Sequence, residues 1–174
     1  MKKVSISSSK EAIEYEDKLR LTAEQSKERL IEIASSLGDL EFLKRLKFDP
    51  VGLDPLDCGR DLNLIEQINQ TFTYLASFRA ARILLQRHKE LKRLYLNLGT
   101  VGGSDIESDP IHLVACEVFS ATKPSSNNKL NKDIKKVLKT EARYKYVFFM
   151  CPDIEQGIYP KKAVEGVTVW SLGV

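Results

Sequence analysis

Residues 102–121 read GGSDIESDPIHLVACEVFSA. The pattern predicts a short strand, a turn at Asp109-Pro110, and a longer strand rich in Val, Leu and Phe. If the two strands form a hairpin, residues on either side of the turn lie roughly opposite each other. Asp105 in the first strand and Glu117 in the second are therefore expected to be neighbours.

Two carboxylates in such surroundings need partners. Asp105 follows a pair of glycines, and Glu117 is surrounded by apolar strand residues. A buried carboxylate costs free energy unless it is paired, hydrogen-bonded or metal-bound, and two such oxygen ligands suit a hard cation such as Mg²⁺ or Mn²⁺. A metal held there would activate water for in-line attack on a phosphate. The structural alternatives are a turn role for Asp105 and an ion pair between Glu117 and an arginine such as Arg82.

The segments on both sides predict an α/β domain with a mixed β-sheet flanked by helices. Before the two strands, apolar residues at three- and four-residue spacing predict a long helix over residues 63–97, with a break near Lys89 as an alternative. After them follow a helix over residues 127–141, a continuous apolar strand over 144–151 and a last strand over 164–172.

The N-terminal part has a different character. Residues 1–48 predict a helical extension, with one or two helices over 9–36 and a short helix over 39–47. Residues 49–62 contain two prolines and two glycines and are expected to be a loop or linker. The main domain then spans residues 63–174.

This order of elements resembles the PD-(D/E)xK, or restriction endonuclease-like, nuclease superfamily. The resemblance covers about residues 63–172: a helix, Gly-x-Asp, about ten residues, Glu in an apolar strand, a basic helix and an apolar strand. It implies that Asp105 and Glu117 bind Mg²⁺ or Mn²⁺ and that the domain hydrolyses phosphodiester bonds. Glu66, on the helix before the first strand, matches a glutamate that often assists in this superfamily.

One position departs from the family pattern. The superfamily usually has a lysine two residues after the glutamate, where this sequence has Phe119, which can neither donate a proton nor stabilise an anion. Some members supply the lysine from the following helix, which makes Lys129 the first candidate, Lys123 the second and Lys132 the third. The expected catalytic set is Asp105, Glu117, Lys129 and Glu66.

The net charge of +3 is modest, but basic residues concentrate on two predicted helices. Such a distribution suits the phosphates of nucleic acid, with duplex DNA as the first expectation; two solvated helix faces are the plain alternative. The residues expected to contact nucleic acid are Arg79, Arg82, Lys123, Asn128, Lys132 and Lys136. Asn127 and Asn128 would most simply cap the helix that follows them.

The sequence also indicates a location and excludes a membrane span. No run approaches the roughly 18 apolar residues that a transmembrane helix needs, and the N-terminal residues do not resemble a signal peptide. The three cysteines form no close pair, which indicates buried free thiols in a reducing, cytoplasmic setting and argues against zinc.

Two other hypotheses compete with the nuclease. The same fold could be a catalytically inactive module that binds nucleic acid or protein, because Phe119 removes the usual lysine. In an unrelated α/β protein, Asp105 and Glu117 would be structural and lie far apart. The oligomeric state is open, although a cut through both strands commonly needs two active sites and hence a homodimer.

Overall fold

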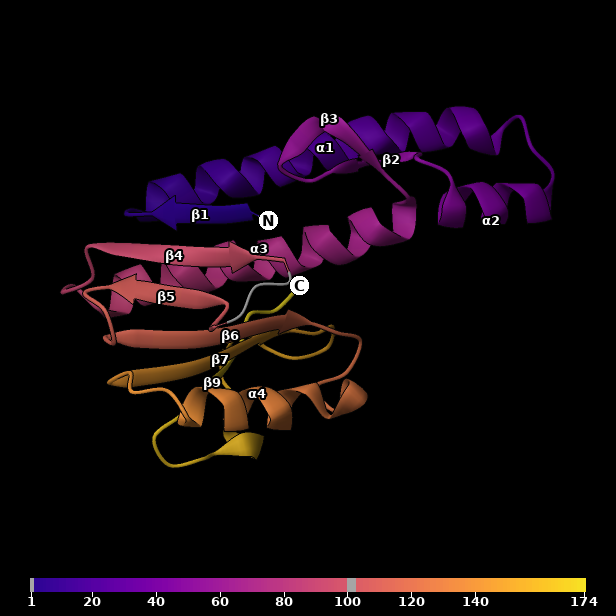
Figure 1. The fold of residues 1–174 in the computed structure, drawn as a ribbon. Coiled ribbons are helices and arrows are strands. Elements are labelled where there is room, and N and C mark those ends of the chain that lie inside the picture. Colours follow the sequence, from indigo (N-terminus) through magenta and orange to yellow (C-terminus); the bar gives the residue numbers. More distant parts are fainter. Residues whose placement is uncertain (1, 100–102) are drawn as a thin grey trace. The chain divides into compact units, whose positions relative to one another are not determined.

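The computed structural model describes residues 2–99 and 103–174, and the chain divides into two compact units. The sheet unit comprises Met1–Ala12 and Ala76–Val174, and the helical unit comprises Ile13–Leu75. Figure 1 shows the elements of both units. Each unit is described by itself below.

One mixed sheet forms the centre of the sheet unit. Its strands are β1 (Lys2–Ile6), β4 (Arg93–Leu98), β5 (Ile106–Asp109), β6 (Val114–Ser120), β7 (Tyr144–Met150), β8 (Gly157–Ile158) and β9 (Thr168–Ser171). Across the described residues the seven strands lie in the order β1-β4-β5-β6-β7-β9-β8. The strands from β1 to β6 pair antiparallel, β6, β7 and β9 pair parallel, and β8 returns antiparallel along β9. The expected α/β class with a mixed sheet flanked by helices is therefore confirmed.

The parallel step from β6 to β7 requires a crossover. Helix α4 (Lys129–Leu138) provides it, after the short 3-10 turn η1 (Ser126–Asn128). A second 3-10 turn, η2 (Pro160–Lys162), lies between β8 and β9. The apolar positions of α4 recur at helical spacing, and α4 packs on β6 and β7 with its buried side on the sheet.

The contact between α4 and the sheet is a buried apolar core. Phe119 of β6 and Phe149 of β7 pack against Ile134 and Val137 of α4, and the two phenylalanine rings lie 5.9 Å apart. Side chains of a strand alternate between its two faces. Glu117, two residues before Phe119, therefore points toward α4 as well.

The opposite face of the sheet carries the other apolar positions. Leu94 of β4 and Ile106 of β5 are fully buried there. The second half of helix α3 (Leu64–Arg87) lies behind these strands (Figure 1). At its end, the Arg87 guanidinium lies 5.0 Å from the centre of the Trp170 ring on β9.

The long helix predicted over residues 63–97 is wrong in its last part. The helix ends at Arg87, and Arg93–Leu98 is strand β4. Leu94 and Leu98 also fit helical spacing, so the pattern in sequence was ambiguous. Antiparallel pairing with β1 on one side and β5 on the other makes this segment a strand instead of a helix. Strand β1 was not predicted, because five residues that include two lysines and a serine carry little strand signal.

The helical unit consists of most of α1 (Ser9–Ala34), α2 (Asp39–Phe48), a hairpin of β2 (Gly52–Asp54) and β3 (Asp57–Leu62), and the first half of α3. The hairpin occupies residues expected to be a loop, and side-chain contacts hold it. Gln67 of α3 accepts a hydrogen bond from the Leu53 N–H at 3.0 Å. Arg29 of α1 pairs with Asp61 of β3 at 2.7 Å. These contacts come from distant segments, so turn residues alone could not show them.

Among the described residues, no helix combines the length and apolar content needed to cross a membrane. The expectation of buried free thiols is confirmed for Cys116 and Cys151 and is wrong for Cys58, which is an exposed free thiol.

Candidate active site

Asp105 and Glu117 lie next to each other in the sheet. Ile106 of β5 pairs with Cys116 of β6, so the residue before the first and the residue after the second are adjacent. The Asp105 carboxylate accepts a hydrogen bond from the Val118 N–H at 2.8 Å, and its carbonyl accepts one from the Asn97 N–H at 2.8 Å. Neighbouring strands thus fix the Asp105 side chain beside Glu117, as the hairpin pattern predicted.

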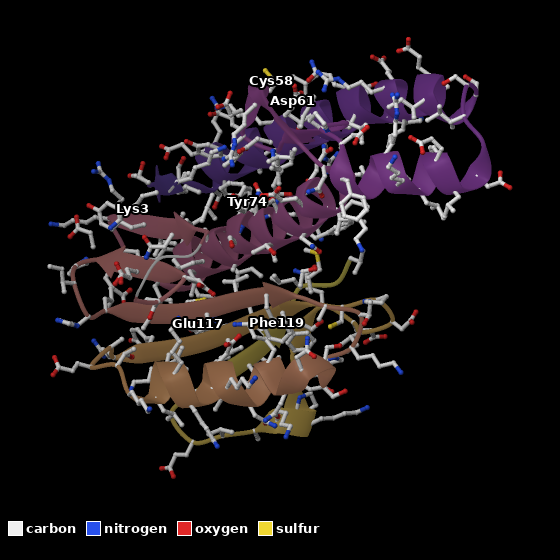
Figure 2. All side chains as sticks on the ribbon, turned by 45° about the vertical axis from the view of Figure 1, so that its right-hand side comes forward. Lys3, Cys58, Asp61, Tyr74, Glu117 and Phe119 are labelled. Atoms are coloured by element: carbon white, nitrogen blue, oxygen red, sulfur yellow. The ribbon has the colours of Figure 1, made fainter. Side chains whose placement is uncertain are left out.

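Glu117 is a buried carboxylate with one oxygen bonded and one oxygen without a partner. The residue is only 1% exposed. Its Oε2 accepts a hydrogen bond from Lys136 Nζ at 2.7 Å, whereas Oε1 is buried and has no hydrogen-bond partner within the described part of the chain. Figure 2 shows Glu117 and Phe119 on β6, in the layer between the sheet and α4.

The surroundings of Glu117 disfavour its charged form. Burial raises the pKa of Glu117 to about 7, and the nearby charge of Asp105 adds to that rise. The hydrogen bond from Lys136 and its charge act in the opposite direction without cancelling the effect. A carboxyl group poised in this way gains from a second cation beside its free oxygen.

Helix α4 carries two lysines and one aspartate on the side that faces this acid pair. Lys129 Nζ lies 2.7 Å from Asp133 Oδ1, and Lys136 Nζ contacts Glu117. Asp133 is buried, its Oδ2 lacks a partner among the described residues, and burial raises its pKa. Burial is the largest single influence on Lys136 and lowers its pKa, but the hydrogen bond to Glu117 and the charges of Glu117, Asp105 and Asp133 together outweigh it, so the pKa is raised.

Of the four predicted catalytic residues, Asp105 and Glu117 lie together in the sheet. The lysine that contacts Glu117 is Lys136, not the predicted Lys129. Glu117 forms an ion pair with Lys136, a partner other than the Arg82 suggested as the structural alternative. Glu66 belongs to the helical unit, where its exposed carboxylate accepts a hydrogen bond from Gln70 at 3.2 Å.

The residues expected to contact nucleic acid lie on different elements. Arg79 and Arg82 are half-buried on α3, and Arg79 donates to the Gly173 carbonyl at 3.5 Å. Lys123 and Lys132 are exposed, before and within α4. Asn128 occupies the N-cap position of α4 in a left-handed conformation, and its side chain makes no capping hydrogen bond. Its Oδ1 instead accepts a hydrogen bond from Asn131, so the simple capping role is wrong for Asn128.

The acid pair fits a hard divalent cation. Among the described residues, no three His, Cys, Asp or Glu side chains form a ready-made metal site. Mg²⁺ is commonly held by only one or two carboxylates, with water and substrate phosphate completing its shell. Glu117 Oε1 is a buried acceptor that has no hydrogen-bond partner in the part of the chain that the structure describes. Such a cation would satisfy it, and Asp105 supplies a second carboxylate beside it.

Sequence reasoning missed the positions of Asp133 and Lys136 in this cluster. A signal for them existed, because residues 129, 133 and 136 are separated by four and three residues and share one helix face. The helix also directly follows the strand that carries Glu117. The choice among its lysines required the depth and rotation of α4 on the sheet, which the sequence pattern does not supply.

In comparisons with known proteins, the chain matches no family model, no curated protein and no solved structure.

Proposed function

We propose that the sheet unit is a metal-dependent nuclease that hydrolyses phosphodiester bonds in nucleic acid, with DNA as the first candidate. One observation carries the proposal: Glu117 is buried beside Asp105, with one oxygen on Lys136 and the other without a partner among residues 2–99 and 103–174. An unpartnered buried carboxylate oxygen costs free energy. Such a cost persists in folded proteins mainly where a site requires it.

The order of elements also supports the resemblance to PD-(D/E)xK nucleases. Moving residues 93–98 from helix to strand leaves a helix, then the strands with Asp105 and Glu117, then a basic helix and an apolar strand. This is the order on which the resemblance rested. The parallel pairing of β6 and β7 across α4 places that helix directly over Glu117.

The roles of the acids follow from their contacts. Asp105 and Glu117 would hold Mg²⁺ or Mn²⁺, Glu117 through Oε1 and Asp105 through its carboxylate. When bound, the metal would supply an activated water and stabilise charge on the phosphate. Val118 N–H, which donates to Asp105, would keep that carboxylate oriented.

Lys136 would take the part of the lysine that the family pattern places at the position of Phe119. Phe119 faces α4 but packs against Phe149 in the core, so a charged group at that position would be buried in apolar surroundings. Lys136 reaches Glu117 from the opposite layer, with its side chain 46% exposed. An ammonium has three donors, and those not used by Glu117 could stabilise negative charge on the phosphate.

The alternative is a nuclease-like module without catalysis that binds nucleic acid or protein. The Lys136–Glu117 ion pair favours it, because that pair partly neutralises Glu117 without a metal. The unpartnered Oε1 disfavours it. Metal binding distinguishes the two hypotheses, since an inactive module has no need of a cation.

The direct test is cleavage of supercoiled plasmid and of single-stranded circular DNA with Mg²⁺, Mn²⁺ or EDTA. Wild-type protein should cut with metal and not with EDTA, and Asp105→Asn and Glu117→Gln should each abolish cutting. Glu165→Gln removes an exposed acid of the same unit and should cut like wild type. Cleavage that survives both active-site changes would overturn the assignment.

A further inference from the structure

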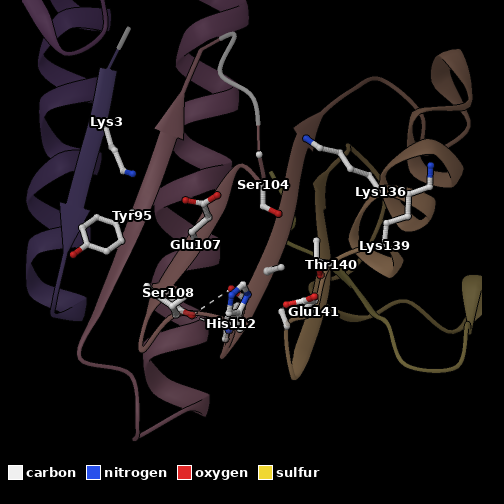
Figure 3. A pocket seen from close by; sticks show the side chains of 15 residues that line it. Lys3, Tyr95, Ser104, Glu107, Ser108, His112, Lys136, Lys139, Thr140 and Glu141 are labelled. Carbon is white, nitrogen blue, oxygen red and sulfur yellow. Dashed lines mark hydrogen bonds between the residues drawn. The ribbon is translucent and has the colours of Figure 1, made fainter.

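A cavity of about 730 Å³ lies beside the acid pair, entirely within the sheet unit. Its floor is the face of the sheet next to α4, with Tyr95 of β4 and Glu107 of β5. Figure 3 shows Lys3 of β1 on one side, and Lys136 and Lys139 on the side of α4. The volume falls in the range of roughly 300–1,000 Å³ typical of sites for small ligands, so it suits one or two nucleotides.

The cavity exists because α4 is offset on the sheet. The helix packs on β6 and β7, and the same face of β4 and β5 carries half-buried side chains. Tyr95 and Glu107 are cross-strand partners, and Glu107 in turn pairs with Ala115 of β6. These three residues form a continuous floor across three strands.

The chemistry of the walls matches a nucleotide strand. Three lysines, Lys3, Lys136 and Lys139, offer ammonium groups for phosphates on both sides of the floor. The Tyr95 ring is half-buried, with the Lys3 ammonium 5.0 Å from its centre. Proteins that bind single strands combine a cationic groove with aromatic side chains on which bases stack. Glu107 adds an acceptor for the exocyclic amino group of a base.

The cavity is continuous with the proposed active site. Lys136 lines the cavity and also contacts Glu117. Ser104 lines it too and directly precedes Asp105. A strand whose phosphate lies at the acid pair would therefore place a neighbouring nucleotide in the cavity.

We propose that this cavity binds an unpaired stretch of nucleic-acid strand, with one base stacked on Tyr95 and flanking phosphates near Lys3 and Lys139. The preferred ligand is then a single strand or a frayed end, in place of the fully paired duplex expected from the sequence. A role of this strand as substrate rests on the proposed nuclease function, but binding in the cavity does not require cleavage. The two claims can therefore be tested separately.

The experiment measures binding of fluorescently labelled oligonucleotides to the full chain in EDTA, where no metal-dependent cleavage occurs. A 12-nucleotide single strand should bind at least tenfold more tightly than a blunt duplex of the same sequence. Tyr95→Ala should weaken single-strand binding about tenfold or more, as loss of base stacking on an aromatic ring does. Tyr95→Phe keeps the ring and should restore it.

A matched pair of lysine variants tests the phosphate contacts and is independent of any folding defect at Tyr95. Lys139→Gln removes a lysine that lines the cavity at the C-cap of α4, and Lys135→Gln removes an exposed lysine within α4 that does not line it. Lys139→Gln should weaken binding severalfold and lower its salt dependence. Lys135→Gln should change binding by less than twofold.

Three results would overturn the inference: equal or tighter binding of the duplex, unchanged binding by both Tyr95→Ala and Lys139→Gln, or displacement of the strand by an equimolar mononucleotide. The last result would identify a free nucleotide as the ligand. Binding that depends on Tyr95 without any cleavage would refute the nuclease but keep the cavity. Metal-dependent cleavage, combined with strand binding that neither Tyr95→Ala nor Lys139→Gln weakens, would support the nuclease and refute the cavity as the binding site.

Discussion

Lys136 Nζ lies 2.7 Å from Glu117 Oε2, joining the last turn of α4 to the middle of β6. The pair is asymmetric, because the Glu117 side chain is 1% exposed and that of Lys136 is 46% exposed. The lysine can therefore contact solvent or a ligand while it still holds the acid. This single contact links the interior of the sheet, the proposed active site and the adjoining cavity.

Lys136→Gln should reduce metal-dependent cleavage by about 10²-fold or more, the typical cost of losing one group that stabilises a transition-state anion. Lys129→Gln should have a much smaller effect, because its ammonium contacts Asp133. Initial rates on single-stranded and duplex substrates would measure both, with Lys135→Gln as the solvent-exposed control. A larger loss for Lys129→Gln than for Lys136→Gln would return the role to the lysine favoured by sequence.

The stability of the metal-free protein should fall as pH rises from 4.5 to about 7. Burial raises the pKa of Glu117 from 4.5 to about 7, so in this window the folded state holds a proton that the unfolded chain has lost. Stability linked to that proton is complete below pH 4.5 and is lost as pH passes through 7. The change is on the order of 2–3 kcal/mol.

Urea unfolding of wild type and Glu117→Gln in EDTA, at several pH values from 4.5 to 8, would measure this dependence. The glutamine has no proton to lose, so its free energy of unfolding should vary less across the window than that of wild type. Parallel curves for the two proteins would show that Glu117 titrates near its ordinary pKa. Mg²⁺ should flatten the wild-type curve by stabilising the ionised form.

Much of the central sheet could be predicted from local sequence patterns. The short strand before the turn at Asp109-Pro110, the run of Val, Leu and Phe around Glu117 and the apolar run over residues 144–151 appear as β5, β6 and β7, the last ending at Met150. The adjacency of Asp105 and Glu117 followed from the same hairpin. Local pattern is sufficient there, because the turn is short and fixes which residues face each other.

The parts that could not be predicted depend on contacts between distant segments. Strand β4 reads as helix until β1, about 90 residues earlier, is seen to pair with it. The same is true of Lys136, since five other lysines of the segment 123–139 stand at comparable sequence distances. Only the packing of α4 on β6 selects the one that reaches Glu117.

Metal binding itself should be measurable and pH-dependent. Titration calorimetry should show Mg²⁺ or Mn²⁺ binding to wild type, and Asp105→Asn and Glu117→Gln should each abolish it. Because the pKa of Glu117 is about 7, binding should release a proton and weaken as pH falls below 7. Titrations in buffers of different ionisation heat would detect that proton. Unchanged affinity between pH 6 and pH 8 would contradict Glu117 as a ligand.

Phe119→Lys tests whether this fold can use a lysine two residues after Glu117, where PD-(D/E)xK nucleases usually have one. The change places an ammonium in the core formed by Phe149, Ile134 and Val137, and burying an unpaired charge is costly. It should therefore destabilise the protein at least as much as Phe119→Ala, for which about 3–5 kcal/mol is typical of a buried phenylalanine.

Phe119→Leu keeps an apolar side chain and should cost less, which makes it the matched control for loss of the ring. Urea unfolding and cleavage rates of the three variants would be compared at equal folded fraction. The expected order of stability is leucine, then alanine, then lysine, with no gain in cleavage for the lysine. If the lysine variant folds and cuts faster than wild type, the site can accept a lysine from β6, and Lys136 is then not its necessary replacement.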